Sequence, residues 1–269
     1  MTYDARERSA DLGRPVELYT FMRGALSYRY TSANVDRTVA FNLYTSAPIE
    51  RDKIEQGPEI NRSGLSITVP RDFPIAQLYM ISPPTDVVSL ILQQYHEGDG
   101  ELAVIWSGRV LGVSFMDSKA KIELEPIGTS VRRNGLRRMY QKLCPRVLYS
   151  ASCGVSASTY RVSAVADVSG VTVTAGVLGT HADGYWKGGY IEWPIAGGLT
   201  ERRFIFDHVG TSIELDMPPV GLVSGTLVTF YPGCDHTLGT NGCAKFSNQV
   251  NYGGMPYIPS NNPYANQVF

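Results

Sequence analysis

The pentapeptide LSITV at Leu65–Val69 and the longer run ELAVIWSGRVLGVSF at Glu101–Phe115 decide the fold class of this chain. In the pentapeptide, apolar and polar residues alternate, which is the period-2 pattern of a half-buried strand. The longer run is rich in residues that favour strands. Together they predict antiparallel β structure in the first half of the chain.

Similar short runs recur from one end of the sequence to the other, separated by turn residues. The chain contains 27 glycines and 16 prolines, so turn-forming residues are abundant between the runs. The further runs are Val16–Met22, Arg37–Tyr44, Val87–Tyr95, Lys121–Ile127, Tyr160–Ala166, Gly170–Ala175, Gly188–Pro194, Glu201–Asp207, Thr211–Met217 and Thr226–Pro232.

One segment, Thr129–Leu143, breaks this pattern. Its apolar residues fall near helical spacing, and Pro145 stops a helix soon afterwards, so we predict a short basic helix at about Leu136–Leu143. The predicted fold is mainly β, with two β-rich, barrel-like, antiparallel halves around that helix. An irregular tail rich in Cys, Gly and Pro begins at Gly233. We place the domain boundary near Ile127–Asn134, which gives domains 1–130 and 131–269.

Bulk composition narrows the range of functions. Charged residues make up only 18% of the chain, against a usual value of about 25%. Either a large part of the surface faces other proteins, or the core is larger than average. The net charge is −1, so nothing global points to nucleic acid or a membrane surface. The polar N-terminal sequence has no apolar signal region, so we expect folding in a cytoplasm, where thiols stay reduced.

The four cysteines form two matched pairs, Cys144 with Cys153 and Cys234 with Cys243, and each pair is a C-x8-C motif. In a reducing compartment this pattern suggests one metal site with four thiolate ligands. The alternative is four unrelated buried thiols. Glycine or proline adjoins each cysteine, which is typical of loops and favours the metal site.

The identity of the metal is less constrained by the sequence. Structural zinc usually takes cysteines two to four residues apart, whereas loops of eight residues suit a bulkier cluster, so we favour an iron–sulfur cluster, of the [4Fe–4S] type, with zinc as the second choice. A basic stretch leads into the first ligand, and its cations would stabilise an anionic site. Those cations are Arg132, Arg133, Arg137, Arg138, Lys142 and Arg146.

Two cysteine-bearing stretches resemble a known family. They are RRNGLRRMYQKLCPRVLYSASCGV at Arg132–Val155 and GCDHTLGTNGCAKFSNQVNYGGMPYIP at Gly233–Pro259. Both are similar to the baseplate hub, or tail-tip hub, proteins of siphophages and gene transfer agents, and more distantly to the minor tail protein L of phage lambda. GYWKGGYIEW at Gly184–Trp193 also resembles the family, as does YTSAPIERDKIE at Tyr44–Glu55 more diffusely.

This resemblance implies a structural role in the virion, at the phage tail tip, after assembly in the host cytoplasm. It implies a homotrimeric ring between the distal tail and tape measure proteins on one side and the central fibre or receptor-binding protein on the other. It also implies that Cys144, Cys153, Cys234 and Cys243 ligate an iron–sulfur cluster. No membrane and no sequence-specific nucleic acid are expected as partners.

An enzyme is not expected. Cys234-Asp235-His236 brings a thiol, an acid and an imidazole together, but catalytic triads are assembled from separate elements. Known zinc-enzyme, phosphate-loop, nucleophile-elbow and dinucleotide motifs are absent from the sequence. Two alternatives to the structural hub stay open at this point: an iron–sulfur redox or sensing protein, and a zinc-containing structural protein that binds nucleic acid.

Overall fold

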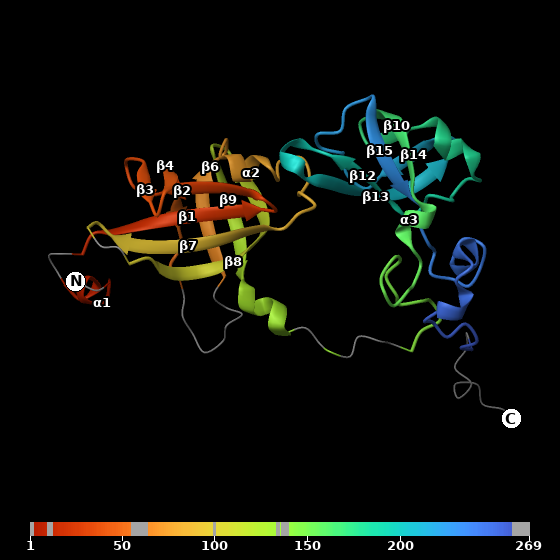
Figure 1. The fold of residues 1–269 in the computed structure, drawn as a ribbon, viewed down its shortest axis with the longest axis horizontal. Coiled ribbons are helices and arrows are strands. Elements are labelled where there is room, and N and C mark those ends of the chain that lie inside the picture. Colours follow the sequence, from red (N-terminus) through yellow and green to blue (C-terminus); the bar gives the residue numbers. More distant parts are fainter. Residues whose placement is uncertain are drawn as a thin grey trace. The chain divides into compact units, whose positions relative to one another are not determined.

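The fold was analysed in a computed structural model, which describes residues 3–9, 13–54, 64–98, 101–132, 135 and 140–259. The chain divides into two compact units, Met1–Arg133 and Asn134–Phe269. Each unit has its own β-sheet and its own hydrophobic core. Strands β1 to β9 belong to the first unit and β10 to β15 to the second, and Figure 1 labels most of them.

The first unit is a nine-stranded sheet in the order β3-β4-β2-β1-β7-β8-β9-β6-β5. All neighbouring strands pair antiparallel except β2 and β4, which pair parallel. Two short α-helices and a 3-10 helix, Ile127–Arg132, accompany the sheet. The elements are α1 Tyr3–Glu7, β1 Pro15–Arg23, β2 Leu26–Thr31, β3 Arg37–Val39, β4 Asn42–Ser46, β5 Glu50–Arg51, β6 Leu65–Pro70, α2 Pro74–Gln77, β7 Val88–His96, β8 Ala103–Met116 and β9 Lys119–Pro126.

This sheet curls back on itself around one apolar core. After β4, the backbone N–H of Ala47 still donates to the carbonyl of Thr31 at 2.9 Å, and the chain then reaches β5. Arg51 in β5 forms an ion pair with Glu17 in β1 across the curl. The inward residues of the long strands β1, β6, β7 and β9 are almost fully buried, as the period-2 pattern requires. Examples are Phe21, Ile67, Leu90 and Ile122.

The second unit is a closed six-stranded barrel in the order β10-β11-β14-β13-β12-β15. Its interior is filled by large side chains, with Trp186, Trp193 and Phe230 at most 1% exposed. The strands are β10 Val162–Ser169, β11 Thr172–Thr174, β12 Tyr190–Pro194, β13 Thr200–Val209, β14 Ser212–Leu215 and β15 Thr226–Tyr231, with helix α3 at Ala157–Tyr160 and 3-10 helices at Gly176–Thr180, Ala196–Gly198, Cys243–Phe246 and Gln249–Asn251.

The predicted fold class, mainly β with barrel-like halves, is confirmed, while two local predictions need correction and one strand was not predicted. The run Arg37–Tyr44 is a hairpin, β3 and β4, and not one strand. Strand β2, which no run predicted, has no clear alternation of buried and exposed residues. The predicted helix is absent at Tyr140–Leu143, while 136–139 lie outside the described residues.

The carbonyl groups at the end of that predicted helix are bonded to the C-terminal tail. The Tyr252 hydroxyl donates to the carbonyl of Lys142 at 2.6 Å, and the Met255 backbone N–H donates to the carbonyl of Gln141 at 2.8 Å. These long-range bonds explain why helical spacing alone predicted the wrong local structure for Tyr140–Leu143. Among the described residues, no helix has the length and hydrophobicity needed to span a bilayer.

Gly189 lies where the barrel closes between β12 and β15. A Cβ atom at Gly189 would be 1.9 Å from the carbonyl oxygen of Tyr231, which is a backbone atom and cannot yield easily. We therefore expect Gly189→Ala to lower the free energy of unfolding by about 1–3 kcal/mol, measured by urea denaturation of the full chain. Gly176→Ala is the matched control, because a Cβ there meets nothing within 4 Å. Equal stability of the two variants would contradict this closure.

Candidate metal centre

The four cysteines lie in two irregular segments of the second unit, here called the first cysteine segment, Cys144–Gly154, and the second cysteine segment, Cys234–Phe246. The first precedes α3 and the barrel, and the second follows the last barrel strand β15. In Figure 1 the first segment is green and the second is blue, and they lie beside each other at the end of the barrel. The entry to the barrel and its exit therefore meet at this centre.

Backbone hydrogen bonds join the two segments directly. The Cys144 N–H donates to the carbonyl of His236 at 2.9 Å, and Nδ1 of His236 lies 2.9 Å from the carbonyl oxygen of Cys144. Within the second segment, the Cys243 N–H donates to the carbonyl of Thr237 at 2.9 Å. The reciprocal bond between Cys144 and His236 holds residues 92 positions apart in the sequence side by side.

All four cysteines are free thiols and largely removed from solvent. Cys144, Cys153 and Cys243 are 8%, 8% and 6% exposed, and Cys234 is of intermediate burial. Cys153 and Cys234 belong to one apolar cluster that also contains Phe246. Cys234, Cys144 and Cys153 are each close enough to Cys243 for their charges to raise its pKa.

Three of the four sulfur atoms accept N–H groups from the protein. His236 donates its backbone N–H to Sγ of Cys234 at 3.3 Å, and Gly253 donates its own to Sγ of Cys144 at 3.3 Å. The side-chain amide of Asn248 lies 3.8 Å from Sγ of Cys153 and also donates to the Cys153 carbonyl at 2.7 Å. N–H donors of this kind stabilise a sulfur in its anionic form, which is the form that binds a metal.

Two glycines bring the tail close enough for one of these bonds. A Cβ at Gly254 would lie 2.5 Å from the carbonyl oxygen of Lys142, and one at Gly253 would lie 2.9 Å from Nε of Arg146. Neither glycine has a positive φ, so their role is close approach of the backbone. Asn248 also joins the tail to the first cysteine segment, because its side-chain amide donates to the carbonyl of Cys153, 95 residues away.

The centre is attached to the barrel by an aromatic and a cationic side chain. The Tyr149 hydroxyl donates to the carbonyl of Pro232 at 2.7 Å, and its ring meets Tyr190 and Tyr231 edge-on. Nζ of Lys245 donates to the carbonyls of Tyr185 and Gly233, at 2.8 and 2.5 Å. The Tyr149 bond fixes the first cysteine segment against the barrel wall, and the Lys245 bonds fix the second.

Burial makes the thiols of Cys243 and Cys234 harder to ionise by raising their pKa values. Burial, followed by the charges of Cys234, Cys144 and Cys153, raises the pKa of Cys243 to about 11. Burial also raises the pKa of Cys234, against the lowering effect of the His236 N–H. Because four thiolates repel one another when buried, a bound cation is what would let all of them ionise.

Within the part of the chain that the structure describes, no three His, Cys, Asp or Glu side chains are placed to hold one metal ion. The thiols are thus neighbours without being at ligand distance from a common point. The two observations are compatible, because charges act over longer distances than the metal–sulfur bond of about 2.3 Å.

Of the predicted cations, Lys142 and Arg146 are described, and only Arg146 is tied into the centre. It donates to the carbonyl of Ser152 at 2.6 Å and to that of Asn251 at 2.5 Å, so it links the first cysteine segment to the tail. Lys142 is exposed. Residues 133, 137 and 138, and the side chain of Arg132, lie outside the described residues.

The tripeptide Cys234-Asp235-His236 has a structural explanation. Oδ1 of Asp235 accepts bonds from the N–H and the hydroxyl of Thr237, at 2.9 and 2.7 Å. The His236 ring bonds the Cys144 carbonyl. Both side chains hold the loop. The sequence reasoning missed the roles of His236, Lys245 and Tyr149, and only the closeness of these residues to cysteines in the sequence could have suggested them.

Known proteins resemble this chain in the sequence around the metal centre and in the fold. Residues 184–262 match a protein-family model described as Phage conserved hypothetical protein BR0599. The chain is 25% identical over 178 residues to an uncharacterized protein of Xylella fastidiosa (strain 9a5c), a match that covers 61% of this chain and 37% of that protein. The chain thus spans well under half the length of this curated relative.

The fold has a close structural counterpart. It is similar to a chain in a solved structure of the virion of a native gene transfer agent particle, with a TM-score of 0.74. The two chains are 19% identical, and the superposition covers 97% of this chain and 93% of the other. At this identity the likeness concerns the fold, and it extends over both units of the chain.

The raised pKa of Cys243 predicts a pH dependence for the metal-free protein. Below pH of about 8.5, the ordinary pKa of a thiol, folded and unfolded chains both hold the Cys243 proton. Between that value and about 11, the unfolded chain ionises while the folded chain does not, so stability is lost as pH rises. We expect the free energy of unfolding to fall by at most about 1.4 kcal/mol per pH unit in this window.

The measurement is chemical denaturation of the chelator-treated chain at several pH values. Cys243→Ser supplies the control, because the contribution of this thiol is the difference between the two pH profiles. Parallel profiles for the two proteins would contradict a raised Cys243 pKa.

Proposed function

We propose that this chain is a structural hub protein of a phage-type tail tip. In this proposal it forms a homotrimeric ring that joins the distal tail and tape measure proteins to the central fibre or receptor-binding protein. What carries the proposal is the fold likeness to a chain of a gene transfer agent virion over 97% of this chain. The phage-conserved family description over residues 184–262 agrees with it.

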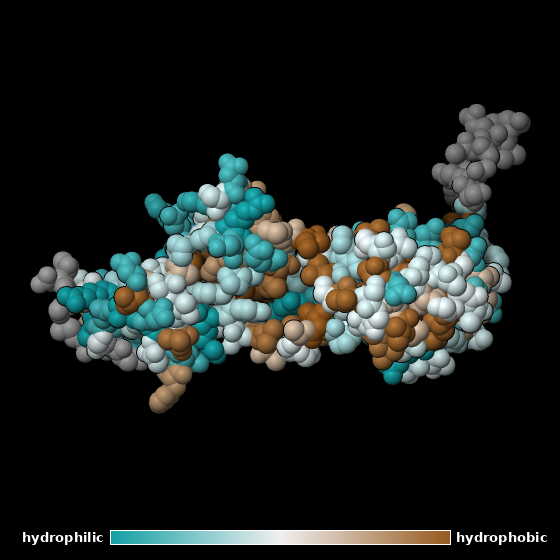
Figure 2. Space-filling view, turned by 90° about the horizontal axis from the view of Figure 1, so that it is seen from above, coloured by the Kyte–Doolittle hydropathy of each residue, from teal (hydrophilic) through white to brown (hydrophobic). Residues whose placement is uncertain are grey.

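The surface supports a protein that works inside an assembly. Many large apolar side chains are more than half exposed, including Leu111 in β8 and Phe206 in β13. Figure 2 shows such hydrophobic residues, in brown, interspersed with hydrophilic ones over the visible face. Together with a charge content of 18%, these residues suit contacts with neighbouring proteins.

We also propose that Cys144, Cys153, Cys234 and Cys243 hold an iron–sulfur cluster of the [4Fe–4S] type. The donor chemistry supports such a group, since all four thiols are free and three of the sulfur atoms accept N–H groups. When bound, the cluster would supply metal–thiolate bonds between the two cysteine segments.

The role proposed for the cluster is to cross-link the fold. The first cysteine segment leads into the barrel and the second leaves it, so a single bound group would close the loop that contains the whole barrel. Cross-links over loops of this length contribute on the order of 2–4 kcal/mol, largely by restricting the unfolded chain. Gly253 and Asn248 bond the tail to two of the same sulfur atoms, those of Cys144 and Cys153.

Cys243→Ser tests the cross-linking role. We expect the variant to lose the bound metal, to expose the tail at 248–259 to protease, and to lose about 2–4 kcal/mol of unfolding free energy in the second unit. The first unit should keep its fold, because its core contains none of these residues. Limited proteolysis with metal analysis measures both effects.

Val250→Ser is the matched control, because it introduces the same residue into the same tail at a side chain that is 91% exposed. It should keep both metal and tail. In a phage that carries Cys243→Ser, tails should fail to assemble. If such tails assembled normally and failed only at DNA delivery, the result would contradict the cross-linking role and would indicate that the cluster acts as a functional switch.

A further inference from the structure

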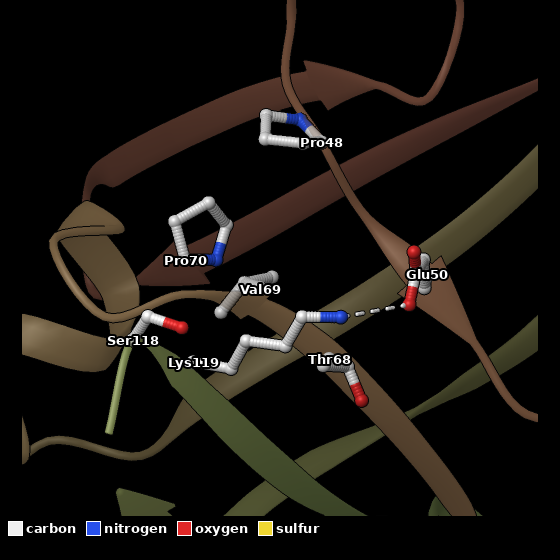
Figure 3. A pocket seen from close by; sticks show the side chains of 7 residues that line it. All are labelled: Pro48, Glu50, Thr68, Val69, Pro70, Ser118 and Lys119. Carbon is white, nitrogen blue, oxygen red and sulfur yellow. Dashed lines mark ion pairs between the residues drawn. The ribbon is translucent and has the colours of Figure 1, made fainter. Parts of the chain in front are cut away.

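The two charged groups that line the hollow on the first unit are paired with each other. This hollow, of about 190 Å³, lies between the β4–β5 connection, the end of β6 and the β8–β9 turn. Figure 3 shows its Lys119 ammonium directed toward Glu50, 3.5 Å away. Val69 in its lining belongs to the hydrophobic core. The metal centre of the second unit, by contrast, contains a buried carboxamide, that of Asn248, which lies close to a sulfur atom.

Asn248 joins one cysteine of each pair. Its backbone N–H donates to the carbonyl of Cys243 at 2.9 Å. Its side-chain amide donates to the carbonyl of Cys153 at 2.7 Å and lies 3.8 Å from Sγ of the same residue. Asn248 is 8% exposed, so water competes little for these bonds.

The orientation of the Asn248 carboxamide is fixed by Asn251. Nδ2 of Asn251 donates to Oδ1 of Asn248 at 2.7 Å, so the oxygen faces Asn251 and the NH₂ group faces Cys153. The carbonyl of Asn251 in turn accepts a bond from Arg146 at 2.5 Å. A Cβ at Gly154 would lie 3.0 Å from Nδ2 of Asn251, so glycine at this position leaves room for that amide.

A short carboxamide meets all the demands of this position. The side chain must accept at one end, from Asn251, and donate at the other, toward the carbonyl and the sulfur of Cys153. An aspartate would accept at both ends, and a leucine of similar size would do neither. The N–H groups that His236 and Gly253 bring to sulfur atoms belong to the backbone, which every residue type except proline supplies. Of these three donors, Asn248 is therefore the one whose residue type matters to the sulfur.

A donor beside a metal-bound sulfur changes the electronic properties of the metal. Hydrogen bonds to the sulfur atoms are among the factors that set the reduction potential of an iron–sulfur cluster. Reduction adds negative charge, and an N–H group stabilises the more negative form. The amide of Asn248 would thus raise the reduction potential of a cluster bound to Cys153.

We infer that Asn248 is a positioning residue of the cysteine centre, which orients Cys153 for metal binding and raises the reduction potential of the bound cluster. The inference rests on the cluster of the proposed function and gives a role to a residue outside the four ligands. The tail is then more than a segment that the cluster holds in place, because it contributes a side chain that sets the properties of the cluster.

Redox titration of the full chain, purified without oxygen, tests this role. Asn248→Asp keeps the size of the side chain, removes the N–H donor and adds a negative charge, so the midpoint potential of the cluster should shift to a lower value. Asn248→Leu removes the donor without adding charge and should give a smaller shift in the same direction. Gln249→Glu is the matched control, because it makes the same amide-to-carboxylate change at the exposed neighbouring position, and its potential should stay close to that of the wild type.

Asn251→Asp gives an independent readout that leaves Asn248 itself unchanged. A carboxylate at position 251 can only accept hydrogen bonds, so the Asn248 carboxamide should turn its NH₂ group toward it and its oxygen toward Cys153. The sulfur then loses its donor, and the midpoint potential should fall below that of Gln249→Glu, which carries the same added charge.

Wild-type midpoint potentials in iron-containing Asn248 variants would overturn the inference, and so would a shift in Gln249→Glu as large as that in Asn248→Asp. If the Asn248 variants lose their iron while Gln249→Glu keeps it, the orienting role is supported, and the potential of Asn251→Asp decides the second part. The proposed cluster fails separately, when the wild-type chain itself contains no iron–sulfur cluster.

Discussion

The second unit is organised by the need to place four cysteine side chains in one small buried region. Thiols can be buried cheaply when protonated, but their ionised forms repel one another and lose the stabilisation of water. The pKa of Cys243 is raised by this burial and by the charges of the other three thiolates. The N–H groups of His236 and Gly253, which bond to sulfur atoms, and the nearby cation of Lys245 act in the opposite direction, because they stabilise a negatively charged sulfur.

Several features follow from that requirement. The reciprocal bond between Cys144 and His236 joins the chain before the barrel to the chain after it. Glycines at 253 and 254 let the tail approach the first cysteine segment at distances that a Cβ would forbid. Tyr149 and Lys245 then attach the joined segments to the barrel wall. The barrel thereby acts as the rigid platform on which the centre is held.

The sequence predicted the β architecture well because strand periodicity is a local signal. Alternation in LSITV directly reports that Leu65, Ile67 and Val69 face a core, and all three are at most 2% exposed. Strand β2 was missed because its residues are partly buried on both sides. The hairpin at Ala40 and Phe41 was missed because neither residue is a usual turn residue.

The candidate centre was predictable only in part. The paired cysteines beside glycine and proline correctly suggested loops, and the structure places these loops together. The supporting bonds could not be predicted, because they join residues as far apart as Asn248 and Cys153 or Lys245 and Tyr185. The helix expected at Leu136–Leu143 was inferred from the local spacing of apolar residues and from Pro145. At Tyr140–Leu143 the backbone is not helical, and it forms hydrogen bonds to the tail instead.

The central claim is that the four cysteines act together as one iron–sulfur site. The most direct measurement is the absorbance spectrum and metal content of the full chain purified without oxygen. The account predicts a brown protein that absorbs near roughly 400 nm and contains iron with acid-labile sulfide. A colourless protein that contains zinc, or one without any metal, would contradict it.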